Sequence, residues 1–226
     1  MKTIIFAGGR YEDVDFYKRA TEACDLRIAA DSGAEFMKKI GVLPHILIGD
    51  MDSISFETFE ECHKKGVKIL KFPSRKDEID TELAIIEAMR RSSESVFVAG
   101  AFGTRLDQMM AVFRLMERFE EMVLFNENLY SIVVKEVTVL KSFPGEIWSV
   151  IPLERDTHNV SLDGFEYSIF ERTMEYLRPY GVSNKSIAET VEIDPGDGKL
   201  LVFRYHNGRV DWIDELAGIL KNKKKR

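Results

Sequence analysis

The chain has little cysteine and no long uncharged run, and each scarcity excludes a class of protein. Two cysteines in 226 residues cannot build a disulfide scaffold, and their positions give no metal-ligand spacing. The longest stretches without a charged residue are residues 40–49 and 95–104, well short of the ~18 apolar residues of a membrane span. The N-terminus runs straight into an apolar strand pattern without a signal-peptide cleavage region. We therefore expect a soluble, cytoplasmic protein with reduced thiols.

Basic residues are too few for a general nucleic-acid-binding protein. The chain has 32 Lys and Arg against 38 Asp and Glu, a net charge of −6, whereas nucleic-acid binders normally carry a basic footprint. The apolar fraction of 45% is what an ordinary globular core needs. A length of 226 residues suits one large domain or two modest ones.

The first half of the chain alternates short apolar runs with stretches whose apolar residues recur every three or four positions. This alternation is typical of a parallel α/β sheet with crossover helices, so we predict a Rossmann-like α/β domain over residues 1–126. The apolar runs are Thr3–Ala7, Leu26–Ala30, Ile46–Ile48, Val67–Phe72, Val96–Ala99 and Met122–Phe125, and the helical stretches are Phe16–Ala23, Ser32–Ile40, Phe56–Lys65, Ile79–Arg90 and Leu106–Phe119.

The second half has a different pattern. Its short apolar segments are rich in β-branched and aromatic residues and are separated by turn signals such as Pro144-Gly145, Asp163-Gly164 and Asn207-Gly208. We therefore predict an antiparallel, all-β domain over residues 127–226.

Acidic residues follow four of the predicted parallel strands. Asp31, then Asp50 and Asp52, then Asp77 and Asp80, and finally Asp107 come just after successive apolar runs. Ligands of a parallel sheet bind at the carboxyl ends of its strands, and clustered carboxylates suit Mg²⁺ held together with substrate phosphates. Lys76 and Arg105 add positive charge for phosphate oxygens. The placement predicts a Mg²⁺–nucleotide site for phosphoryl transfer.

Each of these residues also has an ordinary structural explanation. Asp31 can cap the following helix, and Asp77 and Asp80 can be first-turn carboxylates favoured by a helix dipole. Arg105 and Asp107 can form a surface ion pair of small energy. Gly8-Gly9-Arg10 follows the first strand and can cradle a phosphate, but it does not continue into a GxGxxG motif, and the sequence has no Walker A motif.

Four sequence blocks, in this order, resemble the thiamine pyrophosphokinase family. They are AADSGAEFM at 29–37, GVLPHILIGDMDSI at 41–54, KFPSRKDEIDTELAI at 71–85 and GAFGTRLDQMMA at 100–111. GEIWSVIPL at 145–153 and GVSNKSI at 181–187 extend the resemblance into the second half.

The resemblance implies an activity, an architecture and a set of site residues. Members transfer pyrophosphate from ATP to the hydroxyl of thiamine, giving thiamine diphosphate and AMP. They are homodimers with an α/β domain and a β-sandwich domain, and the thiamine site lies at the subunit interface. Matching positions carry over four groups of residues. The Mg²⁺ ligands are Asp50, Asp52 and Asp80, and the catalytic residues are these three with Arg105 and Asp107. ATP is bound by Asp31, Lys76, Asp77 and Arg105, and thiamine is bound by Asp107, Gln108, Ser183 and Asn184.

Some positions depart from the family pattern, and two other functions stay open. Glu35, Ile79 and Thr104 replace a usual Asn, Thr and Gly, which bears on acceptor recognition more than on nucleotide binding. ILIGDMDS at 46–53 also looks like the motif of haloacid-dehalogenase-like phosphatases, with Asp50 as nucleophile, although two strands precede it here. A nucleotide-binding relative without turnover is the non-enzymatic alternative.

Overall fold

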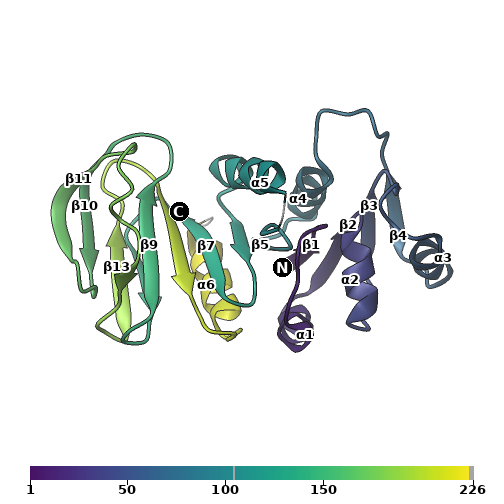
Figure 1. The fold of residues 1–226 in the computed structure, drawn as a ribbon, viewed down its shortest axis with the longest axis horizontal. Coiled ribbons are helices and arrows are strands. Elements are labelled where there is room, and N and C mark those ends of the chain that lie inside the picture. Colours follow the sequence, from purple (N-terminus) through teal and green to yellow (C-terminus); the bar gives the residue numbers. More distant parts are fainter. Residues whose placement is uncertain (104, 224–226) are drawn as a thin grey trace. The chain divides into compact units, whose positions relative to one another are not determined.

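The computed structural model describes residues 1–103 and 105–223, which form two compact units (Figure 1). Unit 1 contains residues 1–115, 121–127 and the described chain from 208 onward, and unit 2 contains residues 116–120 and 128–207. The fold is mixed α/β, with one large sheet and a second, antiparallel sheet. The large sheet contains both parallel and antiparallel strands, so the prediction of a purely parallel sheet is corrected. Its parallel pairs all belong to unit 1.

Six parallel strands in the order β6-β5-β1-β2-β3-β4 form the sheet of unit 1. Most of their side chains are apolar, and Ile4, Ile5 and Phe6 of the central β1 are fully buried. The strands are β1 (Lys2–Phe6), β2 (Leu26–Ala30), β3 (Ile46–Gly49), β4 (Lys68–Lys71), β5 (Ser95–Ala99) and β6 (Met122–Phe125). The helices are α1 (Val14–Glu22), α2 (Gly33–Lys39), α3 (Phe56–Lys64), α4 (Asp80–Arg90), α5 (Leu106–Arg118) and α6 (Trp212–Lys223).

Local capping explains where two of these helices begin. The Asp13 side chain accepts a hydrogen bond from the amide of Phe16 at 2.9 Å, and Ser55 accepts one from the amide of Thr58 at 3.2 Å. Such caps satisfy amides that the first helical turn leaves unpaired. Because β1, β2, β3 and β5 run in the same direction, the loops that follow them meet at one edge of the sheet.

Unit 2 consists of antiparallel strands in two groups, β12-β9-β14-β7 and β11-β10-β13-β8. Alternating burial along β8 is the pattern of a strand with one face in the core. The strands are β7 (Leu129–Val134), β8 (Thr138–Lys141), β9 (Ile147–Pro152), β10 (Thr157–Asp163), β11 (Ile169–Met174), β12 (Asn184–Lys185), β13 (Thr190–Asp194) and β14 (Leu200–Tyr205).

The C-terminal helix does not follow the predicted domain boundary. Residues 127–226 were predicted to form one β domain, but the described chain from residue 208 onward belongs to unit 1. The physical reason is burial: the Trp212 ring of α6 lies 6.1 Å from Phe97 and 5.4 Å from Phe125, and Trp212 is 1% exposed. Among the described residues, no helix is both long and apolar enough to cross a membrane.

Candidate active site

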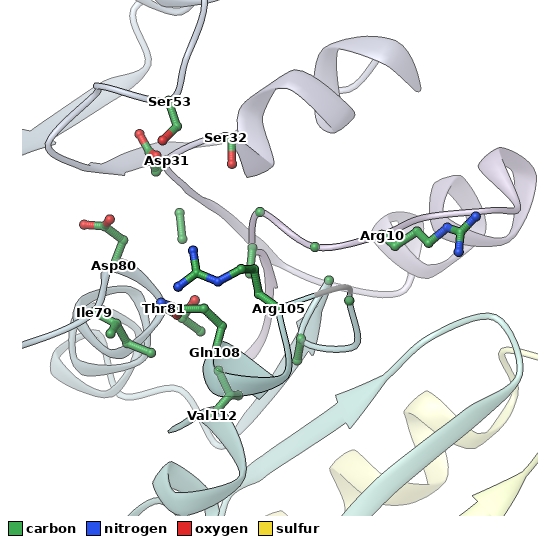
Figure 2. Close-up of a pocket in the computed structure, with 17 residues that line it drawn as sticks. Arg10, Asp31, Ser32, Ser53, Ile79, Asp80, Thr81, Arg105, Gln108 and Val112 are labelled. Carbon is green, nitrogen blue, oxygen red and sulfur yellow. The ribbon is translucent and has the colours of Figure 1, made fainter. Parts of the chain in front are cut away.

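A pocket of about 760 Å³ opens at the carboxyl edge of the parallel sheet in unit 1 (Figure 2). Its walls come from the segments after β1, β2 and β5 and from the first turns of α4 and α5. Four of the predicted site residues line it, namely Asp31, Asp80, Arg105 and Gln108. This is the edge at which the sequence placed the acidic residues, and the volume is that of a small-molecule site.

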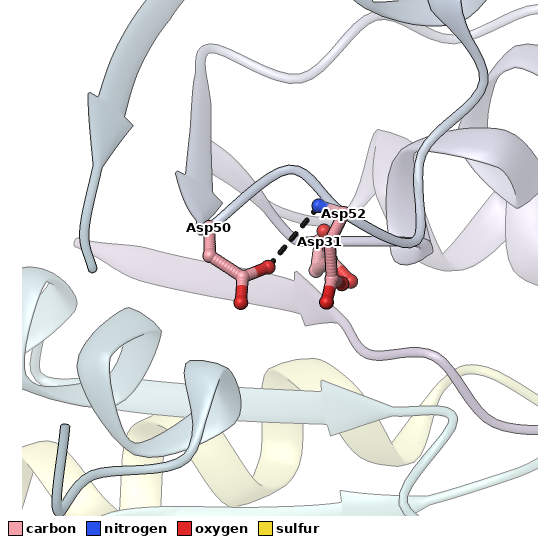
Figure 3. Close-up of side chains that lie close together, drawn as sticks. All are labelled: Asp31, Asp50 and Asp52. Atoms are coloured by element: carbon pink, nitrogen blue, oxygen red, sulfur yellow. Dashed lines mark hydrogen bonds between the residues drawn. The ribbon is translucent and has the colours of Figure 1, made fainter. Parts of the chain in front are cut away.

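Three carboxylates gather beside this pocket (Figure 3). Asp31 directly follows β2, and Asp50 and Asp52 follow β3, so that an oxygen from each lies within 4.8 Å of the other two. The backbone amide of Asp52 donates a hydrogen bond to Asp50 Oδ1 at 3.1 Å, which folds the loop tightly after β3. Asp31 has a positive φ of 47°, a conformation that aspartate tolerates better than most residues.

Asp80 lies close to Asp31 because Gly49 leaves room between them. A Cβ atom at Gly49 would lie 3.1 Å from the Cβ of Asp31 and 3.3 Å from Oδ1 of Asp80. Either contact is tighter than normal packing, and Gly49 itself has a φ of 147° that disfavours a side chain. The Lys76 ammonium lies 3.2 Å from the same Asp80 oxygen. Glycine is therefore required at the end of β3 so that the carboxylates of Asp31 and Asp80 can approach each other.

The electrostatics of the cluster favour a bound cation. Burial raises the pKa of Asp31, and the nearby charges of Asp80 and Asp50 raise it further. Oδ1 of Asp31 is buried without a hydrogen-bond partner among the described residues, whereas the buried Oδ1 of Asp80 is paired with the Lys76 ammonium. Buried carboxylate oxygens beside like charges are costly unless a positive charge accompanies them. This donor set fits a hard divalent ion such as Mg²⁺.

Asp50 carries its charge more easily than Asp31 does. Its pKa is lowered, first by the hydrogen bond from the Asp52 backbone and then by one from the Ser74 side chain. The cluster thus combines a carboxylate that is stabilised in its ionised form with one, Asp31, that is destabilised.

The basic side of the pocket is formed by Arg105, which precedes α5 and projects into the pocket (Figure 2). Its guanidinium contacts Asp107 at two points, Nε to Oδ1 at 2.9 Å and Nη2 to Oδ2 at 2.5 Å. This contact lowers the pKa of Asp107 to about 2. Gln108, one position further along, also lines the pocket.

The remaining predicted residues lie elsewhere. Asp77 is exposed and does not line the pocket, and Ser183 and Asn184 belong to unit 2. The Asn184 amide is used within its own turn, since Oδ1 accepts from the Tyr167 amide at 3.0 Å and Nδ2 donates to the Tyr167 carbonyl at 2.9 Å. Ser183 is exposed with a φ of 62°. Thr104, named among the departures from the family pattern, lies outside the described residues.

Part of the pocket was not assigned from the sequence. Gly8, Gly9 and Arg10 line it after β1, and Gly100 and Gly103 line it after β5. The sequence pattern that could have identified it is Gly8-Gly9 at a strand end. This pattern can cradle a phosphate, but without a GxGxxG motif it was not assigned to the site. Only the fold shows that this segment and Gly100–Gly103 face the same space.

The chain is similar in sequence to known thiamine pyrophosphokinases. The family profile described as "Thiamin pyrophosphokinase, catalytic domain" matches residues 17–125. The thiamine pyrophosphokinase of Bacillus subtilis is 26% identical over 218 residues, which cover 90% of this chain and 99% of the relative. The haloacid-dehalogenase-like alternative is not favoured, since these matches point elsewhere and Asp50 follows the third strand rather than the first.

Solved structures share the whole fold. The thiamine pyrophosphokinase of B. subtilis superposes with a TM-score of 0.81 at 21% identity, covering 92% of this chain and all of that one. The yeast enzyme superposes with a TM-score of 0.75 at 16% identity, covering 96% of this chain and 88% of that one. In sequence and in fold, the chain is therefore similar to thiamine pyrophosphokinases.

Proposed function

We propose that this protein transfers a pyrophosphoryl group from ATP to the hydroxyl of thiamine, giving thiamine diphosphate and AMP. The observation that carries the proposal is the acidic cluster at the pocket edge, with Arg105 projecting into the same pocket, in a chain similar to thiamine pyrophosphokinases. Phosphoryl transfer needs little covalent chemistry from the protein and depends on positioning and charge neutralisation.

Asp50, Asp52 and Asp80 would hold Mg²⁺, and Asp31 is close enough to contribute to the same site. When bound, the ion supplies positive charge that neutralises the phosphate oxygens and helps to orient them. The buried Asp31 oxygen, which has no hydrogen-bond partner among the described residues, supports this assignment.

The transfer itself is an in-line displacement at the β-phosphorus. The thiamine oxygen forms a bond to that phosphorus, the bond to the oxygen bridging the α-phosphorus breaks, and AMP leaves with the electron pair. Arg105 and Lys76 stabilise the charge on the phosphates, and Asp77 contributes on the nucleotide side. Asp107 and Gln108 orient the thiamine hydroxyl, whose proton passes to solvent or to the leaving group. A role for Asp107 in orientation suits a carboxylate with a pKa of about 2, which accepts protons poorly.

The thiamine site would be completed by a second copy of the chain through its Ser183–Asn184 turn, in a homodimer. Ser183 is exposed and available for such contact, whereas the Asn184 amide is committed to Tyr167. We therefore assign Ser183 to direct contact and Asn184 to holding the turn. A cytoplasmic location agrees with two cysteines that are buried as free thiols.

Nucleotide product analysis tests the proposal. The protein is incubated with ATP and Mg²⁺, with and without thiamine, and the products are separated by chromatography. AMP and thiamine diphosphate formed in equal amounts, and only with thiamine, would support pyrophosphoryl transfer. ADP or inorganic phosphate instead would contradict it, and ATP binding without any product would identify a binding relative without turnover.

A further inference from the structure

Tyr11 is a polar residue near the pocket to which the proposed chemistry gives no role. Its hydroxyl donates a hydrogen bond to the carbonyl of Ala7 at 2.5 Å and lies 3.4 Å from the carbonyl of Ala99. Ala7 follows β1 and Ala99 ends β5, and the next residues, Gly8 and Gly100, line the pocket. One hydroxyl therefore contacts the backbone of two segments at the point where each enters the pocket wall.

The ring of Tyr11 is also fixed in place, by packing against a neighbouring ring. It stacks on Phe36 of α2 with a centroid distance of 3.9 Å and an interplanar angle of 3°. Gly100 leaves the space for the hydroxyl, because a Cβ there would lie 2.2 Å from the Tyr11 oxygen. Burial raises the pKa of Tyr11, so the phenol stays neutral and remains a donor.

The two pocket segments also contact each other directly. We call Gly8, Gly9, Gly100 and Gly103 the glycine wall, since all four line the pocket. A Cβ at Gly9 would lie 1.9 Å from the Gly100 carbonyl oxygen, and one at Gly103 would lie 3.5 Å from the Gly9 Cα. The backbone of one segment thus sets the position of the other, with no side chain between them.

A wall without side chains lets a ligand approach backbone amides closely, as phosphate-binding loops do. Its precision depends on groups outside the pocket that fix the backbone, because the glycines themselves are conformationally permissive. Tyr11 is the residue whose hydroxyl touches both strand ends.

We propose that Tyr11 is a positioning residue that holds the glycine wall in the geometry required to bind the adenine nucleotide. This deepens the proposed function and depends on its nucleotide site, but not on the identity of the acceptor. Loss of the hydroxyl frees the Ala7 carbonyl and loosens the wall, so ATP binds less tightly while the acceptor site is unaffected.

Tyr17 provides a matched control. Its ring belongs to the same aromatic group, 5.0 Å from Tyr11 and 5.3 Å from Phe36. Its hydroxyl, however, donates to Glu127 at 2.5 Å instead of to the pocket segments. Tyr11→Phe and Tyr17→Phe both remove one phenol hydroxyl from this group, and only the first removes a contact to the wall.

The experiment measures the dissociation constant of ATP in the presence of Mg²⁺ by calorimetry, the KM values for ATP and thiamine, and the thermal unfolding midpoint. For Tyr11→Phe we expect the dissociation constant and the KM of ATP to rise about three- to tenfold, with the KM of thiamine and kcat near wild type. For Tyr17→Phe we expect a lower unfolding midpoint with unchanged ATP binding. Equal ATP affinity in the two variants would overturn the proposal.

A second pair of variants keeps the test decisive if Tyr11→Phe does not fold. Gly9→Ala forces the two wall segments apart and should weaken ATP binding by more than tenfold. Gly218→Ala, at an exposed position of helix α6 with no atom within 4 Å of its Cβ position, should not change it. Unchanged ATP binding by Gly9→Ala would overturn the proposal. A wild-type protein that binds ATP without forming AMP would contradict the proposed function alone, since the binding comparison still decides the role of Tyr11.

Discussion

Arg105 and Asp107 face each other across a two-point contact, with Nε–Oδ1 at 2.9 Å and Nη2–Oδ2 at 2.5 Å. The contact lowers the pKa of Asp107 to about 2, mainly through the hydrogen bond from Arg105. A carboxylate held in this way is a poor proton acceptor at neutral pH, but it fixes the direction of the guanidinium. In the proposed function, Arg105 acts on phosphate and Asp107 orients the thiamine hydroxyl.

We expect Arg105→Gln to cost far more activity than Asp107→Asn. Loss of the guanidinium removes charge stabilisation from the transferred group and should lower kcat about 10²- to 10³-fold. Asp107→Asn keeps a hydrogen-bonding side chain and should lower kcat about tenfold, with no change in the acid limb of the pH–rate profile. Steady-state kinetics from pH 5 to pH 9 check both values. An acid limb that disappears in Asp107→Asn would show that Asp107 is the base.

Replacing Asp52 with asparagine tests the acidic cluster. Asp52 is exposed, and the hydrogen bond that its side chain accepts from Ser53 at 2.8 Å is local, so the fold should be retained. We expect kcat to fall at least 10²-fold because a charged ligand of the metal site is lost. Asp163→Asn, an exposed aspartate on β10 of unit 2, is the matched control. Near-normal turnover by Asp52→Asn would remove Asp52 from the catalytic set.

Asp31→Asn should separate stability from activity. Burial and the charges of Asp80 and Asp50 raise the pKa of Asp31, so its ionised form destabilises the metal-free fold. The folded state binds this proton more tightly than the unfolded state, and stability is therefore lost as the pH rises above the ordinary aspartate pKa of 3.8. We expect Asp31→Asn to stabilise the protein in EDTA at pH 7 by on the order of 1 kcal/mol, and asparagine also tolerates the positive φ.

The same variant has a pH-dependent control. Below pH 3.8 the wild-type carboxyl is already protonated, so the stability gain should vanish. Added Mg²⁺ should stabilise the wild type more than the variant, because binding to the folded state adds stability. Urea unfolding of the wild type and the variant at pH 7 and below pH 3.8, with EDTA or Mg²⁺, measures these differences in stability. A variant less stable than wild type at pH 7 in EDTA would show that the Asp31 charge does not destabilise the fold.

The sequence predicted those parts of the site in which a functional residue directly follows an apolar strand along the chain. Strands such as Ile46–Gly49 end directly before their acidic residues, and parallel strands bring such ends to one edge. The glycine wall and the place of α6 could not be predicted this way. Both depend on contacts between segments far apart in the sequence, such as Gly9 with Gly100 and Trp212 with Phe97.

Glu35, which departs from the family pattern, has a local structural role. It was noted as a position bearing on acceptor recognition, yet its side chain is not among those lining the pocket. Its carboxylate accepts hydrogen bonds from the Ser55 amide at 2.6 Å and from the Thr58 hydroxyl at 2.8 Å. Burial opposes ionisation, but these hydrogen bonds prevail and lower the pKa of Glu35. Glu35 therefore anchors the start of α3, which follows the Asp50–Asp52 loop. Ile79, by contrast, does line the pocket.

The buried ion pair in unit 2 gives the last prediction. Glu146 Oε2 accepts from Arg204 Nε at 3.0 Å, Oε1 accepts from Nη2 at 3.2 Å, and the Trp148 ring lies 5.2 Å from the guanidinium carbon. The side chains of Arg204 and Glu146 are only 1% and 6% exposed. Glu146→Gln removes a charged partner from the buried Arg204 guanidinium and should lower the free energy of unfolding by about 3–5 kcal/mol.

The exposed pair Arg178–Glu175 is the control for this change, because its N–O distance of 3.0 Å matches that of the buried pair while its side chains are 66% and 49% exposed. We expect Glu175→Gln to lower the free energy of unfolding by less than about 1 kcal/mol. Replacing both buried partners, as in Arg204→Met with Glu146→Leu, should recover most of the lost stability because the buried guanidinium is removed together with its carboxylate. Urea unfolding of the three variants measures these differences. Equal losses for Glu146→Gln and Glu175→Gln would show that water reaches Arg204 and screens its charge.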